Sequence, residues 1–205
     1  MSVRLWLADL DGPNAGLWLA PEEEARRDRF VFPVHRHRFA RGRGLLRQVL
    51  ARELAIAPEA VAFTYNAYGR PTVEGLAFNV SHAENQLMIA VAAHNLGVDI
   101  EAVRLLDDQR GVARTAFSAA ELDAWLALSE NERPQAFYRL WTRKEAVMKA
   151  SGLGFAMGSR SFTLALDEGP QRFGGYAVVD LAAPPGYQAA LAFEGPEPVV
   201  AVNTL

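Results

Sequence analysis

Two acidic residues separated by one position lie in the short segment Gly97–Glu101. Side chains alternate between the two faces of a β-strand, so Asp99 and Glu101 share one face. Val98 and Ile100 then share the other face, which we expect to be buried. Two carboxylates on one face repel each other unless a cation lies between them. The pair therefore predicts either a metal site or a solvated strand end, and this segment alone leaves both open.

A third carboxylate occurs in the segment Trp141–Lys149, which has the composition of a helix. A spacing of four places Trp141, Glu145 and Lys149 on one helical stripe, and the indole indicates that this stripe faces inward. An exposed Glu145–Lys149 pair, supporting the helix by a few tenths of a kcal/mol, is the simpler alternative. Three carboxylates with open coordination positions suit Mg²⁺, which prefers oxygen ligands and shares them with substrate phosphates.

Positive charge is supplied in an unusual way. Of 21 basic residues only two are lysines, Lys144 and Lys149, and they lie five positions apart. An ammonium is a compact, titratable point charge, unlike a guanidinium, so we expect these lysines at a site that needs that chemistry. Eight arginines but one acid, Asp28, occupy residues 26–47 of a chain whose net charge is −3. Such a block indicates an anionic ligand or partner rather than nucleic acid, although a solvated helix face is equally compatible with it.

Polar groups suited to phosphate occur between these segments. Asn79, Ser81 and His82 end the segment Phe78–His82, and Arg70 follows a glycine in a predicted tight turn. Ser81 and His82 are adjacent, so they do not form a hydrolase triad, and they could instead donate hydrogen bonds to phosphate. A buried core histidine is the alternative for His82. The chain lacks a phosphate-binding P-loop and a dinucleotide-binding glycine motif, which disfavours ordinary NTPases and Rossmann proteins.

The elements that must position these groups alternate between helices and strands in both halves of the chain. A capping box at Ser118–Glu121 begins a helix with Leu122, Trp125 and Leu126 buried, and Gly152 ends a later one. We expect strands at residues 3–7, 61–65, 76–80, 87–93, 96–101, 161–166, 176–180, 188–193 and 199–202, and helices from 21, over 35–54, from 118 and over 134–150. This order predicts an α+β fold with antiparallel strands, divided into halves 1–101 and 102–205.

Composition limits the kinds of site that the chain can form and the cellular location that we expect for it. The chain has 205 residues, half of them hydrophobic, and no cysteine, which excludes disulfides, thiolate metal sites and a cysteine nucleophile. No apolar run is long enough to span a membrane, and residues 1–11 lack the pattern of a signal peptide. We therefore expect a cytoplasmic protein that binds neither membrane nor nucleic acid.

Taken together and in order, four motifs resemble the 4′-phosphopantetheinyl transferases of the Sfp type. They are Gly69–Pro71, Phe78–His82, Gly97–Glu101 and Trp141–Ala150. The resemblance spans about residues 20–166 and includes Phe117–Ser118 with Glu121. Each motif is weak alone, but the acidic strand followed some forty residues later by the Trp141–Lys149 pattern is specific. The chain departs from the family at Ala83–Glu84, where a second serine is common.

The resemblance implies a monomer with two similar α+β halves related by a pseudo-twofold axis, and coenzyme A bound between them. The family transfers 4′-phosphopantetheine from coenzyme A to a serine of an acyl- or peptidyl-carrier protein and releases 3′,5′-ADP. By motif, Mg²⁺ would be held by Asp99, Glu101 and Glu145. Glu145 would also take the serine proton, and Lys149 would stabilise or protonate the leaving phosphate. The expected coenzyme contacts are Arg38, Arg70, Asn79, Ser81, His82 and Lys149, with Arg26 aligned only loosely.

Two other functions are compatible with the same residues. One is a non-catalytic protein of the same fold that binds coenzyme A or a carrier protein. The other is a Mg²⁺-dependent phosphohydrolase that uses water in place of the serine hydroxyl. The products distinguish them, since only the transferase adds mass to a carrier protein.

Overall fold

The computed structural model describes all residues from 1 to 205. The helices are α1 (Pro21–Asp28), α2 (Pro33–Leu54), α3 (Gln109–Ala116), α4 (Ala119–Ala127) and α5 (Arg133–Ser151), with short 3₁₀ turns at Pro58–Ala60, Gly154–Met157 and Ser159–Ser161. The strands are β1 (Ser2–Asp9), β2 (Thr64–Tyr65), β3 (Pro71–Thr72), β4 (Ala77–Ala83), β5 (Gln86–Ala92), β6 (Leu96–Ala102), β7 (Gln171–Phe173), β8 (Tyr176–Leu181), β9 (Tyr187–Glu194) and β10 (Val199–Thr204). No helix is long and apolar enough to cross a membrane.

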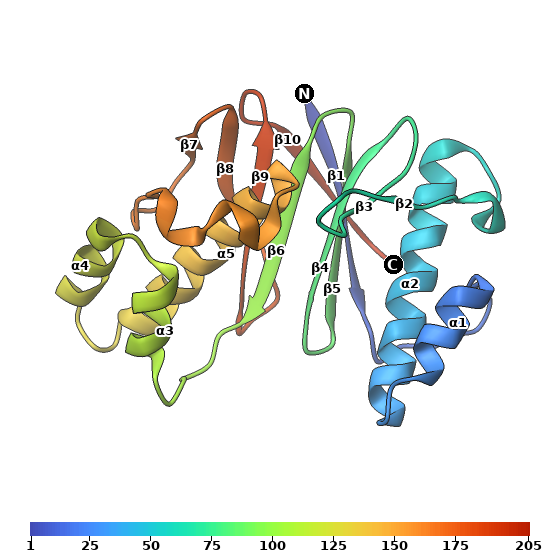
Figure 1. Cartoon of the computed structure of the whole chain (residues 1–205), viewed down its shortest axis with the longest axis horizontal. Helices are drawn as coiled ribbons and strands as arrows, with labels where there is room; N and C mark the ends of the chain where they lie inside the picture. The colour runs from blue at the N-terminus through green and yellow to red at the C-terminus, as the bar shows by residue number, and fades with distance from the viewer.

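Two four-stranded sheets form the centre of the molecule. Their strand orders are β10-β1-β5-β4 and β6-β9-β8-β7, and β2 pairs with β3 in a separate ribbon. All pairs are antiparallel except β1 with β10. Figure 1 shows α1 and α2 on one side of the sheets and α3–α5 on the other. The expected α+β class is confirmed.

The two halves repeat one order of elements. A long helix, a hairpin and a third strand follow one another as α2, β4–β5, β6 and again as α5, β8–β9, β10. In each case the third strand leaves its own hairpin and joins the other sheet, since β6 pairs with β9 and β10 pairs with β1. Residues 96–102 therefore lie with the second sheet and 199–204 with the first, while the division at residue 101 stays a prediction.

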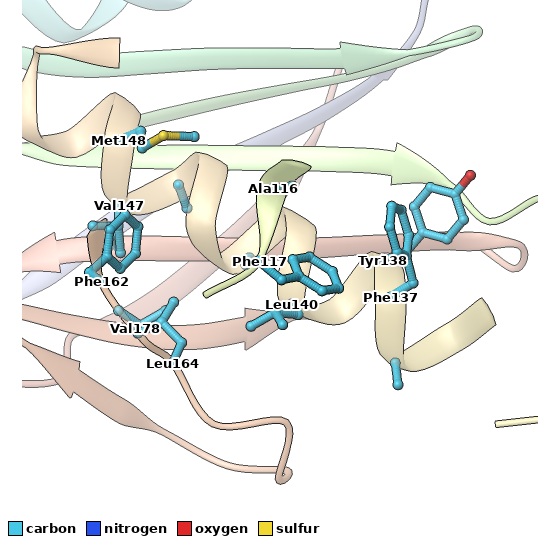
Figure 2. Close-up of a cluster of buried hydrophobic side chains, with 14 of the residues drawn as sticks. Ala116, Phe117, Phe137, Tyr138, Leu140, Val147, Met148, Phe162, Leu164 and Val178 are labelled. Carbon is cyan, nitrogen blue, oxygen red and sulfur yellow. The ribbon is translucent and has the colours of Figure 1, made fainter. Parts of the chain in front are cut away.

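Alternation along the central strands explains the layers. On β5, Leu87, Ile89 and Val91 pack toward α2, whereas Met88 and Ala90 face the second sheet. Both faces of β5 are apolar because both are covered. The cluster between the second sheet and α3–α5 is the largest, and Figure 2 shows its aromatic and aliphatic side chains around α5.

Local signals in the sequence placed several boundaries correctly. The capping box is present, because the Ser118 N–H donates to Glu121 Oε2 at 2.7 Å and Ser118 Oγ accepts from the Glu121 N–H. Gly152 ends α5 at a φ of 73°, a left-handed conformation that favours glycine. Pro33 begins α2 two residues before the predicted start, since proline suits the first helical turn.

Two strand predictions were wrong. Residues 161–166 form no strand, although Phe162 and Leu164 are buried as a strand face would be. Side chains satisfy the backbone there instead: Lys144 Nζ donates to the Phe162 carbonyl and the Leu164 N–H donates to Glu121 Oε1, each at 2.7 Å. Of residues 61–65 only Thr64–Tyr65 is a strand, and before it the Val61 carbonyl accepts a hydrogen bond from the Arg47 side chain.

Candidate active site

The acidic strand β6 lies against α5, and a glycine makes this possible. A Cβ built at Gly97 would lie 2.1 Å from the Ala146 carbonyl oxygen and 2.5 Å from the Ala150 nitrogen, so only glycine fits. Val98 and Ile100 are fully buried between the sheets, as alternation predicted. Asp99 and Glu101 consequently lie on the other face of the strand.

Trp141, Glu145 and Lys149 share one stripe of α5, as their spacing predicted, but the stripe is partly exposed and does not face fully inward. Trp141, Glu145 and Lys149 are each partly exposed, whereas Ala146, Val147 and Met148 between them are buried. The stripe therefore borders solvent at the side of β6 that carries the acids. Because Glu145 and Lys149 are partly exposed, both can meet a ligand.

Asp99 and Lys149 form the closest contact in the cluster. Lys149 Nζ donates to Asp99 Oδ1 at 2.7 Å, and Ser81 Oγ, on β4, donates to the same oxygen at 2.8 Å. Lys149 also donates to Ser81 Oγ at 2.9 Å. Asp99 Oδ2 is buried and has no hydrogen-bond partner. One carboxylate oxygen is thus saturated while the other is available only to a group that enters the site.

The three carboxylates act on one another electrostatically. Burial, together with the charges of Asp99 and Glu101 and against the opposing effect of Lys149, raises the pKa of Glu145 to about 7. Burial and Asp99 likewise raise the pKa of Glu101. A carboxyl group that titrates near neutrality is suited to accept a proton in catalysis. No three acidic or histidine side chains are gathered into a preformed metal-binding cluster, however.

Strand β4 joins the two sheets beside this cluster. Asn79 Oδ1 accepts the Val98 N–H at 2.9 Å, and Ser81 Oγ accepts the Ile100 N–H at 3.4 Å. The polar atoms of these two side chains therefore face β6 in this structure. His82, the next residue along β4, is exposed. Their predicted contacts with a coenzyme stay predictions.

The remaining predicted residues line hollows along β4. Arg70, Asn79 and Lys149 border one of about 230 Å³. Arg38 and His82 border a groove of about 440 Å³ between α2 and β4. A third hollow, of about 310 Å³, is bordered by Glu101 and the apolar face of Trp141. The first two share Val80 and the last two share Glu84, so β4 connects all three.

The two predicted phosphate-binding arginines already have partners. Arg70 donates to the carbonyl oxygens of Lys149, Ala150 and Leu96 at 2.9, 3.1 and 3.1 Å, which fixes the end of α5 against β6. Arg38 forms a bidentate pair with Asp11 at 2.6 and 2.8 Å. Neither set of partners was predictable from the sequence, because they lie on distant parts of the chain.

Acids within the protein offset part of the charge of the arginine block, and carbonyl oxygens bind other members of it. Arg43 and Arg47 both bind Glu23, and the Arg47–Glu23 pair is almost fully buried. Other members of the block are paired with acids or carbonyls: Arg27 with Asp28, Arg36 with Phe30, Arg38 with Asp11, and Arg41 with Pro13. Arg26 stacks on Phe39 at the rim of the 440 Å³ groove. The charge that the sequence suggested for a partner is therefore smaller than the count of arginines implies.

The second lysine belongs to the core and not to the site. Lys144 Nζ donates to both carboxylate oxygens of Glu121 at 2.7 Å, and both side chains are at most 2% exposed. The expectation that both lysines mark functional chemistry was therefore wrong for Lys144. It holds the extended segment after α5 through its bond to the Phe162 carbonyl.

Comparison with known proteins identifies relatives of this chain. A sequence model of the 4′-phosphopantetheinyl transferase superfamily matches residues 95–184. The 4′-phosphopantetheinyl transferase HetI of Nostoc sp. is 37% identical over 166 residues, which cover 75% of this chain and 70% of HetI. The chain belongs to the 4′-phosphopantetheinyl transferase superfamily. The transferase Sfp of Bacillus subtilis is 29% identical over 75% of the chain and 69% of its own length.

Membership in this enzyme superfamily confirms the resemblance inferred from the four motifs. The matched region begins just before β6 and ends after β8, so it contains Asp99, Glu101, Glu145 and Lys149. The groove under α2 is lined only by residues before that region, whereas the hollow beside Arg70 is lined by residues from both sides of its boundary, Lys149 and Gly152 among them. The relatives extend across both halves, since HetI matches three quarters of the chain.

Proposed function

We propose that this protein transfers the 4′-phosphopantetheine group of coenzyme A to a serine hydroxyl of an acyl- or peptidyl-carrier protein, in a Mg²⁺-dependent reaction that releases 3′,5′-ADP. The serine oxygen forms a bond to the phosphorus that carries the pantetheine. The bond from that phosphorus to the bridging oxygen of the pyrophosphate breaks, and 3′,5′-ADP leaves with the electron pair. Superfamily membership supports the reaction class, and the acidic cluster between β6 and α5 supports the site.

The donor set fits a hard divalent cation. Asp99, Glu101 and Glu145 supply oxygen ligands, and the buried, unpartnered Oδ2 of Asp99 is an atom whose burial is costly unless something binds it. Mg²⁺ bound there would neutralise negative charge on the pyrophosphate as the bond to the leaving group breaks. The acids are not gathered into a finished cluster, so substrate oxygens and small side-chain movements would complete the coordination.

Glu145 is our choice for the group that accepts the serine proton. In the metal-free protein its pKa is about 7, and a bound cation would lower this pKa, so the carboxylate would be ionised and ready to accept a proton near neutral pH. It lies on the stripe of α5 that borders solvent, so a carrier serine can approach it directly or through one water. Lys149, one turn further on, would supply positive charge to the leaving phosphate.

Positions along β4 suit the coenzyme itself. The groove of about 440 Å³ presents Arg38, Arg26 and His82 beside the apolar Phe30 and Phe39. This combination suits an adenine ring with an attached phosphate. The hollow with Arg70, Asn79 and Lys149 shares Val80 with it, so one extended ligand can run from the groove toward Lys149.

The experiment is an intact-mass measurement on an apo carrier protein incubated with this protein, coenzyme A and Mg²⁺, with a chelator control. A mass gain of one phosphopantetheine group that the chelator removes supports the proposal. Release of 3′,5′-ADP without a mass gain would favour the phosphohydrolase instead. Coenzyme A binding without turnover, across fatty-acid, polyketide and peptide carriers, would favour the binding protein.

A further inference from the structure

Lys149 has no free ammonium proton in this structure. An ammonium group carries three N–H donors. Nζ donates to Asp99 Oδ1 at 2.7 Å, to Ser81 Oγ at 2.9 Å and to the Val98 carbonyl oxygen at 3.2 Å. Lys149 can therefore bind a phosphate only after at least one of these bonds breaks. Its charged partner in this structure is Asp99.

Asp99 in turn depends on that ammonium. Its side chain is 5% exposed, and burying an unpaired carboxylate is strongly unfavourable. Lys149 and Ser81 both bind Oδ1, and no other charged group in the structure contacts this carboxylate. A divalent cation bound at the unpartnered Oδ2 of the same carboxylate would supply the same compensation and weaken the pull of Oδ1 on the ammonium. The two positive charges would then repel each other within one small site.

We infer that Lys149 is the internal counter-ion of Asp99 in the ligand-free protein and competes with a divalent cation for this carboxylate. The inference rests on the metal role proposed for Asp99 above. Cation binding displaces the ammonium, and the displaced ammonium becomes available to phosphate. Lys149 therefore takes up its role toward the leaving group only when Asp99 has another positive partner.

The structure provides room for this displacement. The Lys149 side chain is 27% exposed and borders the hollow of about 230 Å³ that also contains Arg70 and Asn79. The flexible four-carbon stem can rotate into that space while α5 stays fixed against Gly97. Lys144, the other lysine, has no such freedom because it is buried against Glu121.

The test measures Mn²⁺ binding, by the electron paramagnetic resonance signal of free Mn²⁺, without coenzyme or carrier. We compare wild type with Lys149→Met and with Arg104→Met as a matched control. Arg104 is an exposed residue whose charge acts on Glu101 but which makes no contact with Asp99. Both variants lose one positive charge, so the general effect of charge on Mn²⁺ binding is matched. Competition therefore predicts that Lys149→Met, which also frees Asp99, binds Mn²⁺ at least severalfold more tightly than Arg104→Met.

A second measurement uses the wild-type protein, so that it does not depend on the folding of a variant. Reductive methylation followed by peptide mass analysis reports the reactivity of each lysine, and the chain has only two. The Mg²⁺ concentration is chosen from the first experiment as one that displaces bound Mn²⁺. At this concentration the methylation of Lys149 should increase severalfold. Lys144 serves as the internal control and should not change.

The outcomes separate this inference from the proposed function. Tighter Mn²⁺ binding by Lys149→Met, or a rise in Lys149 methylation with Mg²⁺, supports the competition. The competition is overturned if Lys149→Met binds Mn²⁺ no more tightly than Arg104→Met and if Mg²⁺ leaves the methylation of Lys149 unchanged. Metal-dependent transfer would still stand in that case. Absence of Mn²⁺ binding in every protein overturns both the competition and the proposed metal site, while the carrier mass assay tests transfer independently.

Discussion

Gly97 and Ala146 bring strand β6 and helix α5 into direct backbone contact. A Cβ at position 97 would lie 2.1 Å from the Ala146 carbonyl oxygen, which is closer than real side-chain atoms approach backbone. The charged groups of the site lie on both sides of this contact, with Asp99 two residues along the strand and Lys149 one turn along the helix. The separation of the two elements therefore fixes the separation of Asp99 and Lys149.

Gly97→Ala should consequently damage the site and the fold together. The added methyl group must push α5 away from β6, and overpacking of this kind costs about 1–3 kcal/mol of the free energy of unfolding. We expect a lower melting temperature. We also expect the transfer activity to fall by more than the unfolded fraction of the variant explains. Gly175→Ala is the matched control, since a Cβ there meets nothing within 4 Å and the backbone is not left-handed. If Gly97→Ala and Gly175→Ala changed the melting temperature and transfer equally, the close contact at Gly97 would not be what positions the site.

Lys144→Met should destabilise the protein strongly without touching the site. The substitution leaves Glu121 buried and unpaired, which costs about 3–5 kcal/mol in comparable cases. Urea unfolding measures the change. The double variant with Glu121→Gln should recover part of the loss because the buried charge is gone. If the single variant is as stable as wild type, the ion pair contributes nothing and the order of the segment after α5 needs another cause.

Periodicity and local signals were enough to predict the layers and the faces. Val98 and Ile100 lie in the core and Asp99 on the opposite face because alternation is a property of any strand. The stripe of α5 was predictable for the same reason, since helical spacing fixes which residues share a side. The family resemblance then supplied the function that no local pattern could.

Contacts between distant segments were not predictable. Arg38 binds Asp11, 27 residues away, and Arg70 binds carbonyls at the end of α5, about 80 residues away. Apolar Phe162 and Leu164 alternate with polar residues, a pattern typical of a strand, yet the backbone partners of this segment are side chains such as Lys144 and Glu121. Side chains that replace a neighbouring strand as hydrogen-bond partners produce no periodic pattern in the sequence. Gly97 gave a usable signal, because a glycine inside a strand often marks close backbone approach.

The raised pKa of Glu145 predicts how stability changes with pH. A carboxyl group whose pKa rises from 4.5 to about 7 on folding binds more protons in the folded state between these values. The metal-free protein should therefore lose stability as pH rises through that window. Glu145→Gln removes the effect, so the variant should gain roughly 1–2 kcal/mol relative to wild type at pH 8 after allowance for solvent screening, and little at pH 4.5.

Thermal unfolding at the two pH values, in the presence of a chelator, measures this difference. Glu22→Gln is a suitable control, because Glu22 is exposed on α1. The same pH dependence in Glu145→Gln as in wild type would assign the effect to another group. Added Mg²⁺ should reduce the difference, since a bound cation favours the ionised carboxylate.

Asp99→Asn tests the proposed metal role while keeping the shape of the side chain. The amide retains one oxygen for Ser81 and Lys149 but removes the negative charge, so Mg²⁺ loses a ligand. We expect transfer to fall by about a thousandfold, because a metal ion contributes several kcal/mol of transition-state stabilisation. The circular dichroism spectrum should stay that of wild type. A variant that retains full Mg²⁺-dependent transfer would show that Asp99 is not a ligand.

Arg38→Ala should weaken coenzyme binding with little effect on the chemical step. Arg38 borders the groove of about 440 Å³ under α2, on the far side of β4 from Lys149, and its guanidinium pairs with Asp11. Removing a charge-assisted contact to phosphate costs about 1.5–3 kcal/mol, so KM for coenzyme A should rise roughly tenfold or more while kcat changes little. Asp11→Asn is the informative control. It frees the guanidinium from its internal partner, so KM should fall or stay constant. If instead Arg38→Ala lowers kcat and leaves KM unchanged, Arg38 does not hold the coenzyme and the groove belongs to another ligand.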